Sequence, residues 1–508
     1  MAAGYCLIGL IHTAQRLKGG VAIGAVVLVQ WHNSPNSRTG SYFTLLLKIG
    51  QLTPQGGQRI VLGKEKLQEI AGRVLGFSGA DQTEVLIFSN DERLTRFAVN
   101  TIHQNVSERD VAVRVRAVFG QKMGVASGND LSDEALQKVV ESAETVARFQ
   151  QDNPDFHSLP EPRPVREMEA YAEATAACTP EERAKSVAAI CAMSRENDLE
   201  ASGAFSTGVQ ELVAANSLGV SAYHCSTVAR IVTVIMGQDS SGYGAAANMD
   251  VSALDPEAVG RVAVDKALRS REPADIEPGA YTVILEEEAV ADMLRTLGYL
   301  GFGALAVQEG RSFMSGRFGQ QITGSNISIW DDGYDQRGLV LPFDFEGVPK
   351  QRVSLIENGV AKNVVYDSFT AGREEGKVST GHGLPAPNTF GPFPINLFMA
   401  PGQATKEEML ASTERGIWVT RFHYTNPVHP IKTVLTGMTR DGTFLIEKGK
   451  ITRPLKNFRF TQSILEAFSR AEMLGSELKL IKAGWGNMAL CVPAAKINEF
   501  QFTGATEF

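Results

Sequence analysis

The chain has 508 residues, of which 49 are Lys or Arg and 57 are Asp or Glu, so its formal net charge is −8. Hydrophobic residues make up 43% and charged residues 21%, which is typical of a globular protein and excludes collagen, disorder or a coiled coil as a description of the whole chain. The mildly acidic balance argues against non-specific binding to nucleic acid or to an anionic membrane, because both need a cationic surface.

The first 63 residues are predicted to be an N-terminal extension, for which an unstructured segment is one interpretation. The extension contains the apolar run Val21–Trp31, which at 11 residues is too short to span a bilayer. No other stretch is a candidate for a membrane span. At roughly 150 residues per domain, the length predicts about three domains.

The first domain is expected over residues 64–160. Three strands are predicted from alternating apolar residues, over Glu84–Asn90, Arg93–Asn105 and Asp110–Ala117, with polar turns between them. A helix is predicted over Asp133–Phe149, because its apolar residues recur at helical spacing.

The middle domain is expected over residues 161–275. Its main helix is predicted to begin after Thr179, because Pro180 at the first helical position and Glu182 complete a capping box. The other elements expected here are two hairpins across Glu200–Gly237 and a helix that begins at Asp255-Pro256 and runs to Arg269.

The C-terminal domain is expected over residues 276–508. A strand at Tyr281–Leu285 precedes a helical pattern at Glu286–Tyr299, and many short strands with turn signals follow. The similar segments Leu355–Gly359 and Leu445–Gly449 are predicted to be two hairpins of one large antiparallel sheet. The predicted fold class is therefore α+β, with N-terminal α/β domains followed by a large antiparallel β-rich C-terminal domain.

The cysteines and histidines limit the metal sites that the chain can form. The five cysteines are widely spaced and form no C-x-x-C pair, which predicts neither a disulfide framework nor a cysteine zinc site and favours a cytoplasmic location. No H-E-x-x-H motif occurs. Catalytic zinc usually needs three protein ligands. The remaining metal hypothesis is a site built from His382, His423 and His429, and the alternative is that these histidines make ordinary hydrogen bonds.

Several segments of the C-terminal half carry a resemblance to a known family. They occur in the following order: Glu309–Gln320, Ile329–Gly333, Pro342–Val348, Leu355–Gly359, Ser379–Gly383, Asn396–Gly402 and Phe444–Ile451. This ordered set resembles the TldD/PmbA (TldD/TldE) family of metallopeptidase-related proteins. The resemblance covers roughly residues 64–508.

Active TldD-type members bind zinc through a helix that carries His-Glu-x-x-x-His and through a cysteine from a later strand. In this chain the corresponding positions hold Leu294, Arg295 and Tyr299 on the helix and Phe422 on the strand. None of these side chains is a zinc ligand or a general base. The chain is therefore more similar to the TldE/PmbA side of the family, in which the zinc motif is missing.

The resemblance implies a zinc-less subunit of a cytosolic peptidase complex that degrades or matures small or unfolded peptides. Its expected partners are a TldD-type catalytic subunit, or a second copy of itself in a dimer, and a peptide that adds to a sheet edge. No cofactor is expected. Candidate substrate contacts are Arg317, His382, Asn388 and His423. The alternatives are an active metallopeptidase with the relocated histidine site, which would bind zinc, and a stand-alone peptide-binding protein.

Overall fold

The computed structural model describes residues 9–11, 26–28, 61–483 and 488–505. The chain divides into two compact units, Met1–Ile60 and Val61–Phe508. In the first unit β1 (Gly9–Ile11) and β2 (Val26–Leu28) form an antiparallel pair. The rest of the predicted extension over residues 1–63, apart from its last three residues, lies outside the described residues.

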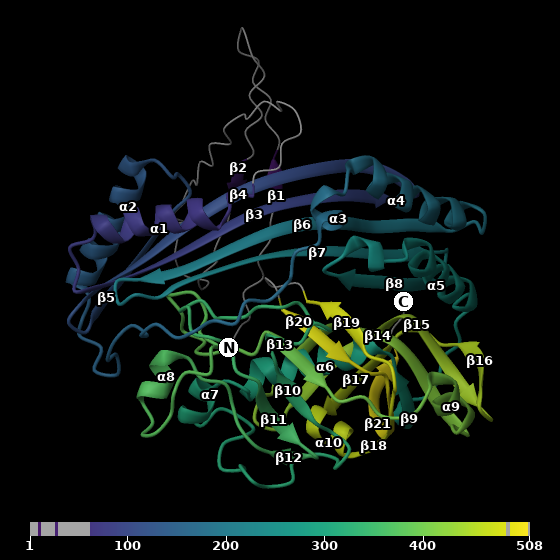
Figure 1. Cartoon of the computed structure of the whole chain (residues 1–508). Helices are drawn as coiled ribbons and strands as arrows, with labels where there is room; N and C mark the ends of the chain where they lie inside the picture. The colour runs from purple at the N-terminus through teal and green to yellow at the C-terminus, as the bar shows by residue number, and fades with distance from the viewer. Residues whose placement is uncertain (1–8, 12–25, 29–60, 484–487, 506–508) are drawn as a thin grey trace, which may run out of the picture. The chain divides into compact units, whose positions relative to one another are not determined.

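The N-terminal half of the second unit is built on one antiparallel six-stranded sheet with the order β5-β4-β3-β6-β7-β8 (Figure 1). Its strands are β3 (Gln82–Ala98), β4 (Thr101–Phe119), β5 (Lys122–Gly128), β6 (Glu200–Asn216), β7 (Ser221–Met236) and β8 (Ser241–Asn248). Strands β3 and β6 pair along most of their length, from Glu84 opposite Asn216 to Phe97 opposite Gly203. The stretches 64–160 and 161–275, predicted as separate domains, therefore share one sheet.

The strands of this sheet are longer than the sequence pattern predicts. The turns expected near Asn90 and Asp110 are wrong, because these two residues lie opposite each other in the middle of the β3–β4 hairpin. Polar pairing replaces the turn, since Asp91 accepts hydrogen bonds from both Arg93 and Arg109. The chain reverses instead at Val99-Asn100, where φ is 50° and 59°. Likewise, β6 and β7 form one long hairpin in place of the two that were predicted.

The helices of this half cover one face of the sheet in two groups. Helices α1 (Lys64–Phe77) and α2 (Asp133–Phe149) pack on the start of β3, the ends of β4 and β6, and β5, whereas α4 (Pro180–Arg195) and α5 (Pro256–Arg269) pack on the end of β3, the start of β6, and β7 and β8. The short helix α3 (Glu173–Ala177) lies between α2 and α4 in sequence. The single helical turn η1 (Val251–Ala253) lies just before α5. The predicted helix over Asp133–Phe149 and the capping box of α4 are confirmed.

The C-terminal part contains two further sheets, which confirms the predicted α+β class with a β-rich C-terminal region. One has the order β12-β11-β10-β13-β20-β19 and the other β14-β9-β21-β17-β15-β16, with β18 paired to β21. Their strands are β9 (Gly279–Leu285), β10 (Ile329–Asp331), β11 (Val353–Glu357), β12 (Val360–Ala361), β13 (Asn396–Met399), β14 (Arg415–His429), β15 (Val434–Glu447), β16 (Lys450–Pro454), β17 (Phe458–Ser463), β18 (Ala471–Leu474), β19 (Lys479–Lys482), β20 (Ala489–Val492) and β21 (Ala495–Ala505).

The two similar segments of the sequence do form hairpins, but in different sheets. Asn358-Gly359 connects β11 to β12, and Lys448-Gly449 connects β15 to β16. All four residues have positive φ, as a tight two-residue hairpin requires. The prediction of one large sheet is wrong because a local turn signal does not determine which distant strand a hairpin joins.

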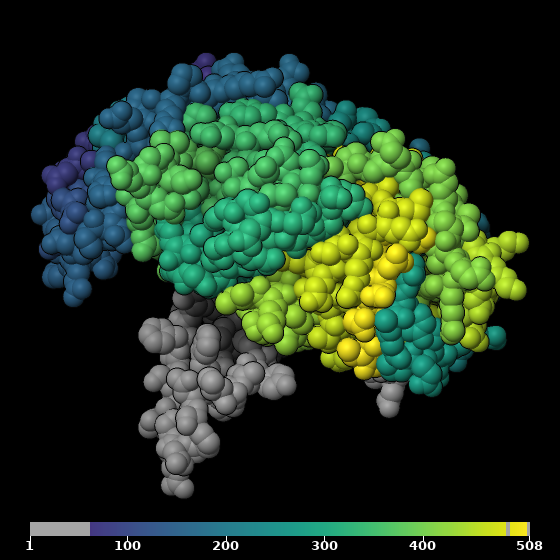
Figure 2. Space-filling model, turned by 90° about the horizontal axis from the view of Figure 1, so that it is seen from below, coloured from purple at the N-terminus to yellow at the C-terminus, as the bar shows by residue number. Residues whose placement is uncertain are grey.

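Helix α6 (Glu287–Gly301) lies between these two sheets and is buried on most of its surface. Together with the strands it forms the largest hydrophobic core of the molecule. The remaining helices are short: α7 (Ala304–Gln308), α8 (Ser368–Gly372), α9 (Lys406–Ala411) and α10 (Ile464–Ser469). Figure 2 shows the face of this part on which the green and yellow segments, far apart in sequence, lie against each other.

The uncovered face of the long sheet meets the C-terminal part at a tightly packed region, which we call the closed contact. Leu86, Leu212 and Phe343 belong to one buried apolar cluster there. Beside it, Arg116 forms ion pairs with Glu84 and with Glu346 of the C-terminal part. Among the described residues, no helix is long and apolar enough to cross a membrane.

Candidate functional site

The helix positions that would carry zinc ligands in an active relative lie on α6. Leu294 is fully buried in the main core. Arg295 pairs with Asp292 one turn earlier, and Asp292 also accepts a hydrogen bond from Thr425 of β14 at 3.0 Å. The Tyr299 ring packs against Phe390, with 4.9 Å between the ring centroids. None of these three side chains is one of the Cys, His, Asp or Glu ligands that form zinc sites in proteins.

The strand position, Phe422, is part of an aromatic cluster. Its ring lies 4.3 Å from that of Phe460 and 5.9 Å from that of Phe500, measured between centroids. Phe422 is 4% exposed, so a buried ring stands at the position of the cysteine ligand of an active relative. The donor set at this place does not fit a zinc ion, and no catalytic step through a metal follows from it.

The histidines of the relocated-site hypothesis are not brought together. In the part of the chain that the structure describes, no group of three His, Cys, Asp or Glu side chains is arranged to hold a metal ion. His423 and His429 lie on the same strand, β14. His382 is buried in the loop between α8 and β13, where both of its ring nitrogens have protein partners.

The surroundings of His382 are a buried network of polar groups. Its Nε2 lies 2.7 Å from Asp331 Oδ1, and its Nδ1 lies 2.9 Å from Thr380 Oγ1. Lys350 Nζ lies 3.8 Å from the same Asp331 oxygen. Burial, and then the nearby Lys350 ammonium, lower the pKa of His382 despite the carboxylate. The order hydroxyl, imidazole, carboxylate resembles a nucleophile relay, but the imidazole and carboxylate are buried, so we assign it a structural role.

The other predicted substrate contacts lie apart. Asn388 donates to Gly391 O and accepts from Phe390 N, so its side chain shapes a turn. Arg317 lies in the loop between α7 and β10. His423 is partly exposed on β14, where burial, and then the charges of Arg440 and Arg421, lower its pKa. Their role in binding stays a prediction.

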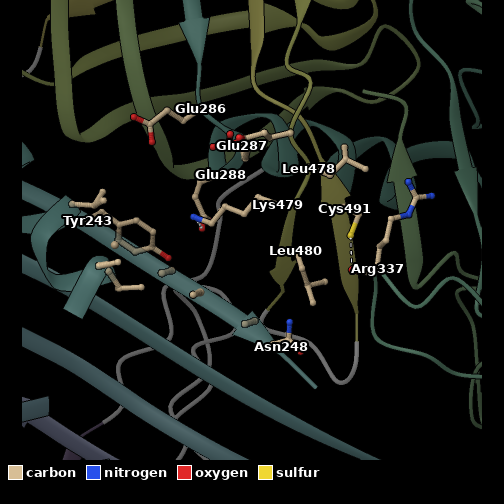
Figure 3. Close-up of a pocket in the computed structure, with 18 of the residues that line it drawn as sticks. Tyr243, Asn248, Glu286, Glu287, Glu288, Arg337, Leu478, Lys479, Leu480 and Cys491 are labelled. Carbon is tan, nitrogen blue, oxygen red and sulfur yellow. Dashed lines mark hydrogen bonds and ion pairs between the residues drawn. The ribbon is translucent and has the colours of Figure 1, made fainter. Parts of the chain in front are cut away.

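A cavity of about 630 Å³ lies at the other end of α6, between β8 of the long sheet and β19 of the C-terminal part (Figure 3). We call it the groove. Seven successive residues, Tyr243–Met249, line one side, and Leu478–Leu480 line the opposite side. Successive side chains of a strand point to opposite faces, so the unbroken run along β8 means that β8 borders the groove with its edge. Both β8 and β19 are the last strands of their sheets.

The end of the groove at α6 is lined by three lysine–glutamate pairs. Glu286, the N-cap residue of α6, pairs with Lys266 of α5 at 2.6 Å and accepts a hydrogen bond from the indole of Trp418 at 2.7 Å. The other two pairs are Lys406–Glu287 at 2.8 Å and Lys479–Glu288 at 3.1 Å. Although burial opposes it, Lys266 and Trp418 lower the pKa of Glu286. The negative charge of each of these three carboxylates is therefore balanced by a lysine of the same chain.

Sequence reasoning missed the groove. The run Glu286–Glu288 is readable as an acidic helix start, but nothing in the sequence brings Lys266 or β8 to it. The residues Ala245–Ala247 carry no reactive group. Their importance depends on the position of β8 as the last strand of its sheet in the described part of the chain, which only the tertiary structure reveals.

Comparison with known proteins assigns the fold. Three family models match, described as PmbA/TldA metallopeptidase domain 1 over residues 83–147, central domain over 159–271 and C-terminal domain over 278–504. A metalloprotease TldD homolog of Haemophilus influenzae is 26% identical over 427 residues, covering 78% of this chain and 87% of that protein. Metalloprotease PmbA of Escherichia coli O157:H7 is 24% identical over 422 residues, covering 79% and 88%.

The solved structure of TldE from Thermococcus kodakarensis superimposes with a TM-score of 0.79 at 20% identity, covering 86% of this chain and all of that one. The long sheet, the two C-terminal sheets and the matched domains together define a protein of the metallopeptidase-related class. The chain belongs to the TldD/PmbA family.

Proposed function

We propose that this chain is a zinc-less, peptide-binding subunit of a cytosolic TldD/PmbA-type peptidase complex. The observation that carries the proposal is the contrast along α6. The positions for zinc ligands hold Leu294, Arg295, Tyr299 and, on β14, Phe422, whereas the groove beside the first turn of the helix remains open.

The groove supports the binding of an extended peptide. Among the described residues, no strand pairs with the outer edge of β8 or of β19, and an extended peptide satisfies the backbone N–H and C=O groups of such an edge by adding a strand. This binding is largely independent of sequence, because it uses the main chain of the peptide. The volume of the groove, about 630 Å³, lies within the usual range of ligand sites.

The catalytic step is assigned to a partner. A TldD-type subunit with an intact His-Glu-x-x-x-His motif supplies the metal and the general base, and this chain supplies a wall of the peptide site. A second copy of this chain supplies neither. The proposal therefore predicts peptidase activity only for the mixed complex.

The first test measures metal and activity. The purified full chain is expected to contain less than a tenth of an equivalent of zinc by mass spectrometry and to cleave no unfolded peptide alone. Co-expression with a TldD-type subunit from the same genome is expected to give a stable complex that cleaves it. Stoichiometric zinc in this chain, lost on His423→Ala, would favour the relocated-site hypothesis instead.

The second test measures peptide binding by fluorescence anisotropy with a labelled, unstructured decapeptide. An added Cβ at Gly244 would meet Val259 O of α5 at 2.4 Å, so Gly244 faces α5 and its neighbour Ala245 faces the opposite side. Ala245→Trp is expected to fill the groove and weaken binding at least tenfold. Val146→Trp on the exposed side of α2 is the matched control and is expected to bind normally. If the chain binds the decapeptide and its genome encodes no TldD-type subunit, the chain is a stand-alone peptide-binding protein instead.

A further inference from the structure

Helix α5 carries two kinds of exposed side chain, and only one kind borders the groove. The exposed residues that do not line the groove are charged and pair with each other along the helix. Arg261 pairs with Glu257 at 3.5 Å, and Arg269 pairs with Asp265 at 3.1 Å. This surface has the composition expected of a helix face that meets only water.

The side of α5 that lines the groove is apolar until its last turn. Ala258 and Val262 are four residues apart and so lie on the same side of the helix, and Lys266 follows one turn later. Val262 is 48% exposed, so an uncharged branched side chain stands in the groove with half of its surface uncovered. An apolar surface that is left open within a cavity is typical of a ligand site.

The apolar surface of the groove extends beyond α5. Met249 follows β8, and Leu478 and Leu480 come from the C-terminal part (Figure 3). All three side chains are only partly buried. Ligand sites are mostly lined by apolar side chains with a few polar groups among them, and the groove shares this composition.

The charged groups of the groove offer little to a charged ligand. Its three lysines are each paired with a glutamate at the start of α6, and Arg337 is held by Asp335 at 2.5 Å. Among the charged side chains that line the groove, Glu477 alone forms no ion pair with a described residue, and it is exposed to solvent. A charged ligand would compete with the existing pairs, whereas an apolar side chain displaces only water from the apolar surface.

We propose that the groove binds one large apolar side chain of the peptide, such as Phe or Leu, against Ala258 and Val262. The inference rests on the proposed peptide binding and adds a preference among peptides to it. Main-chain contacts at a strand edge hold the peptide, and the apolar side chain selects it. Large apolar residues are mostly buried in folded proteins, so this preference directs the chain to peptides and unfolded segments.

The test uses four labelled decapeptides made of Gly, Ser and Gln that differ only in one central residue, which is Phe, Ser, Lys or Glu. Binding to the full chain is measured by fluorescence anisotropy. The Phe peptide is expected to bind about tenfold more tightly than each of the other three, because only its side chain gains from leaving water.

Two variants of the apolar side of α5 locate the contact. Val262→Asn and Ala258→Asn each place an amide there, and the preference for Phe over Ser is expected to fall to under about threefold. Val146→Asn on α2 is the matched control, because that valine is 40% exposed and does not line the groove. The control should keep the tenfold preference, and thermal unfolding of all three variants should match the wild type.

The outcomes separate this inference from the proposed function. Equal binding of the four peptides, each weakened by Ala245→Trp, would overturn the apolar preference and leave the proposed function standing. Tightest binding of the Lys or Glu peptide would overturn it too, because the charged groups would then select the ligand. A tenfold preference that persists in both Val262→Asn and Ala258→Asn would also overturn it. Failure of all four peptides to bind would refute the proposed function itself.

Discussion

The long sheet meets the C-terminal part in two regions that are filled very differently. In the closed contact, Phe343 is fully buried against Leu86 and Leu212, and Arg116 is held between Glu84 and Glu346. At the groove, β8 and β19 both line a cavity, and no strand in the described part of the chain pairs with their outer edges. A firm contact in one region allows the other region to stay open, because the domains need not collapse on each other to be held together.

A second contrast runs along α6 and separates catalysis from binding. The middle and end of the helix, where an active relative would hold zinc, are closed by apolar and aromatic packing. Its first turn borders the groove with neutralised charges. Under the proposed function, the lack of zinc ligands on α6 therefore leaves peptide binding at the groove intact.

The largest effect is expected in the closed contact. Phe343→Ala removes a fully buried ring and leaves a cavity, so the free energy of unfolding should fall by about 3–5 kcal/mol. Leu480→Ala at the groove is the matched change, and we expect it to cost less than about 1 kcal/mol because that side chain is only partly buried. Urea denaturation measures both. Equal losses would mean that the two regions do not differ in the way described.

The closed contact should also respond to acid, because the ring of His224 lies 6.5 Å from that of Phe343, measured between centroids. Burial lowers the pKa of His224 to about 4, against 6.5 for an exposed histidine, while its hydrogen bond to Val340 O opposes the shift. The unfolded chain therefore takes up this proton before the folded one does. The contribution of His224 to the free energy of unfolding is complete above pH 6.5 and is lost as the pH falls toward 4, by about 3 kcal/mol at 1.36 kcal/mol per pKa unit.

His224→Gln tests this by removing the titrating group while keeping an N–H that can reach Val340 O. Its free energy of unfolding, measured in urea at several values of pH, should decline less than that of the wild type between pH 6.5 and 4. An identical decline in both proteins would show that another group is responsible.

These expectations depend on contacts of different range, and the same holds for what the sequence could predict. The helix at Asp133–Phe149 and the cap at Thr179 follow from neighbouring residues and were correctly predicted. The absence of zinc ligands on α6 was readable because it depends only on residue identity. The pairing of β3 with β6 joins residues more than 100 positions apart, and the ion pair Lys266–Glu286 joins two domains, so no local pattern predicts them.

A middle-sized effect is expected where α5 meets α6. Lys266→Met leaves the carboxylate of Glu286, which is largely buried, with the Trp418 indole as its main remaining partner. We expect the free energy of unfolding of this variant to fall by about 2 kcal/mol at neutral pH and the pKa of Glu286 to rise. Since Lys266 helps to hold that pKa below its usual range, the wild type loses this stabilisation as the pH falls below about 4.5.

The control for this variant is Lys138→Met on the exposed face of α2, whose pair with Glu134 is open to solvent. The free energy of unfolding of Lys138→Met should fall by less than about 0.5 kcal/mol. A similar loss in both variants would mean that the pair at the groove contributes no more than a surface ion pair.

The smallest effect is expected from placing one histidine at a position that holds a zinc ligand in active relatives. Tyr299 is 53% exposed, so Tyr299→His should change stability by less than about 0.5 kcal/mol. The variant should retain no zinc after dialysis, because one histidine is not a site and Leu294 and Phe422 remain packed in the core. Metal analysis by mass spectrometry measures this directly. Retention of one equivalent of zinc by Tyr299→His would show that unassigned donors already stand beside α6, and the separation of binding from catalysis drawn above would fail.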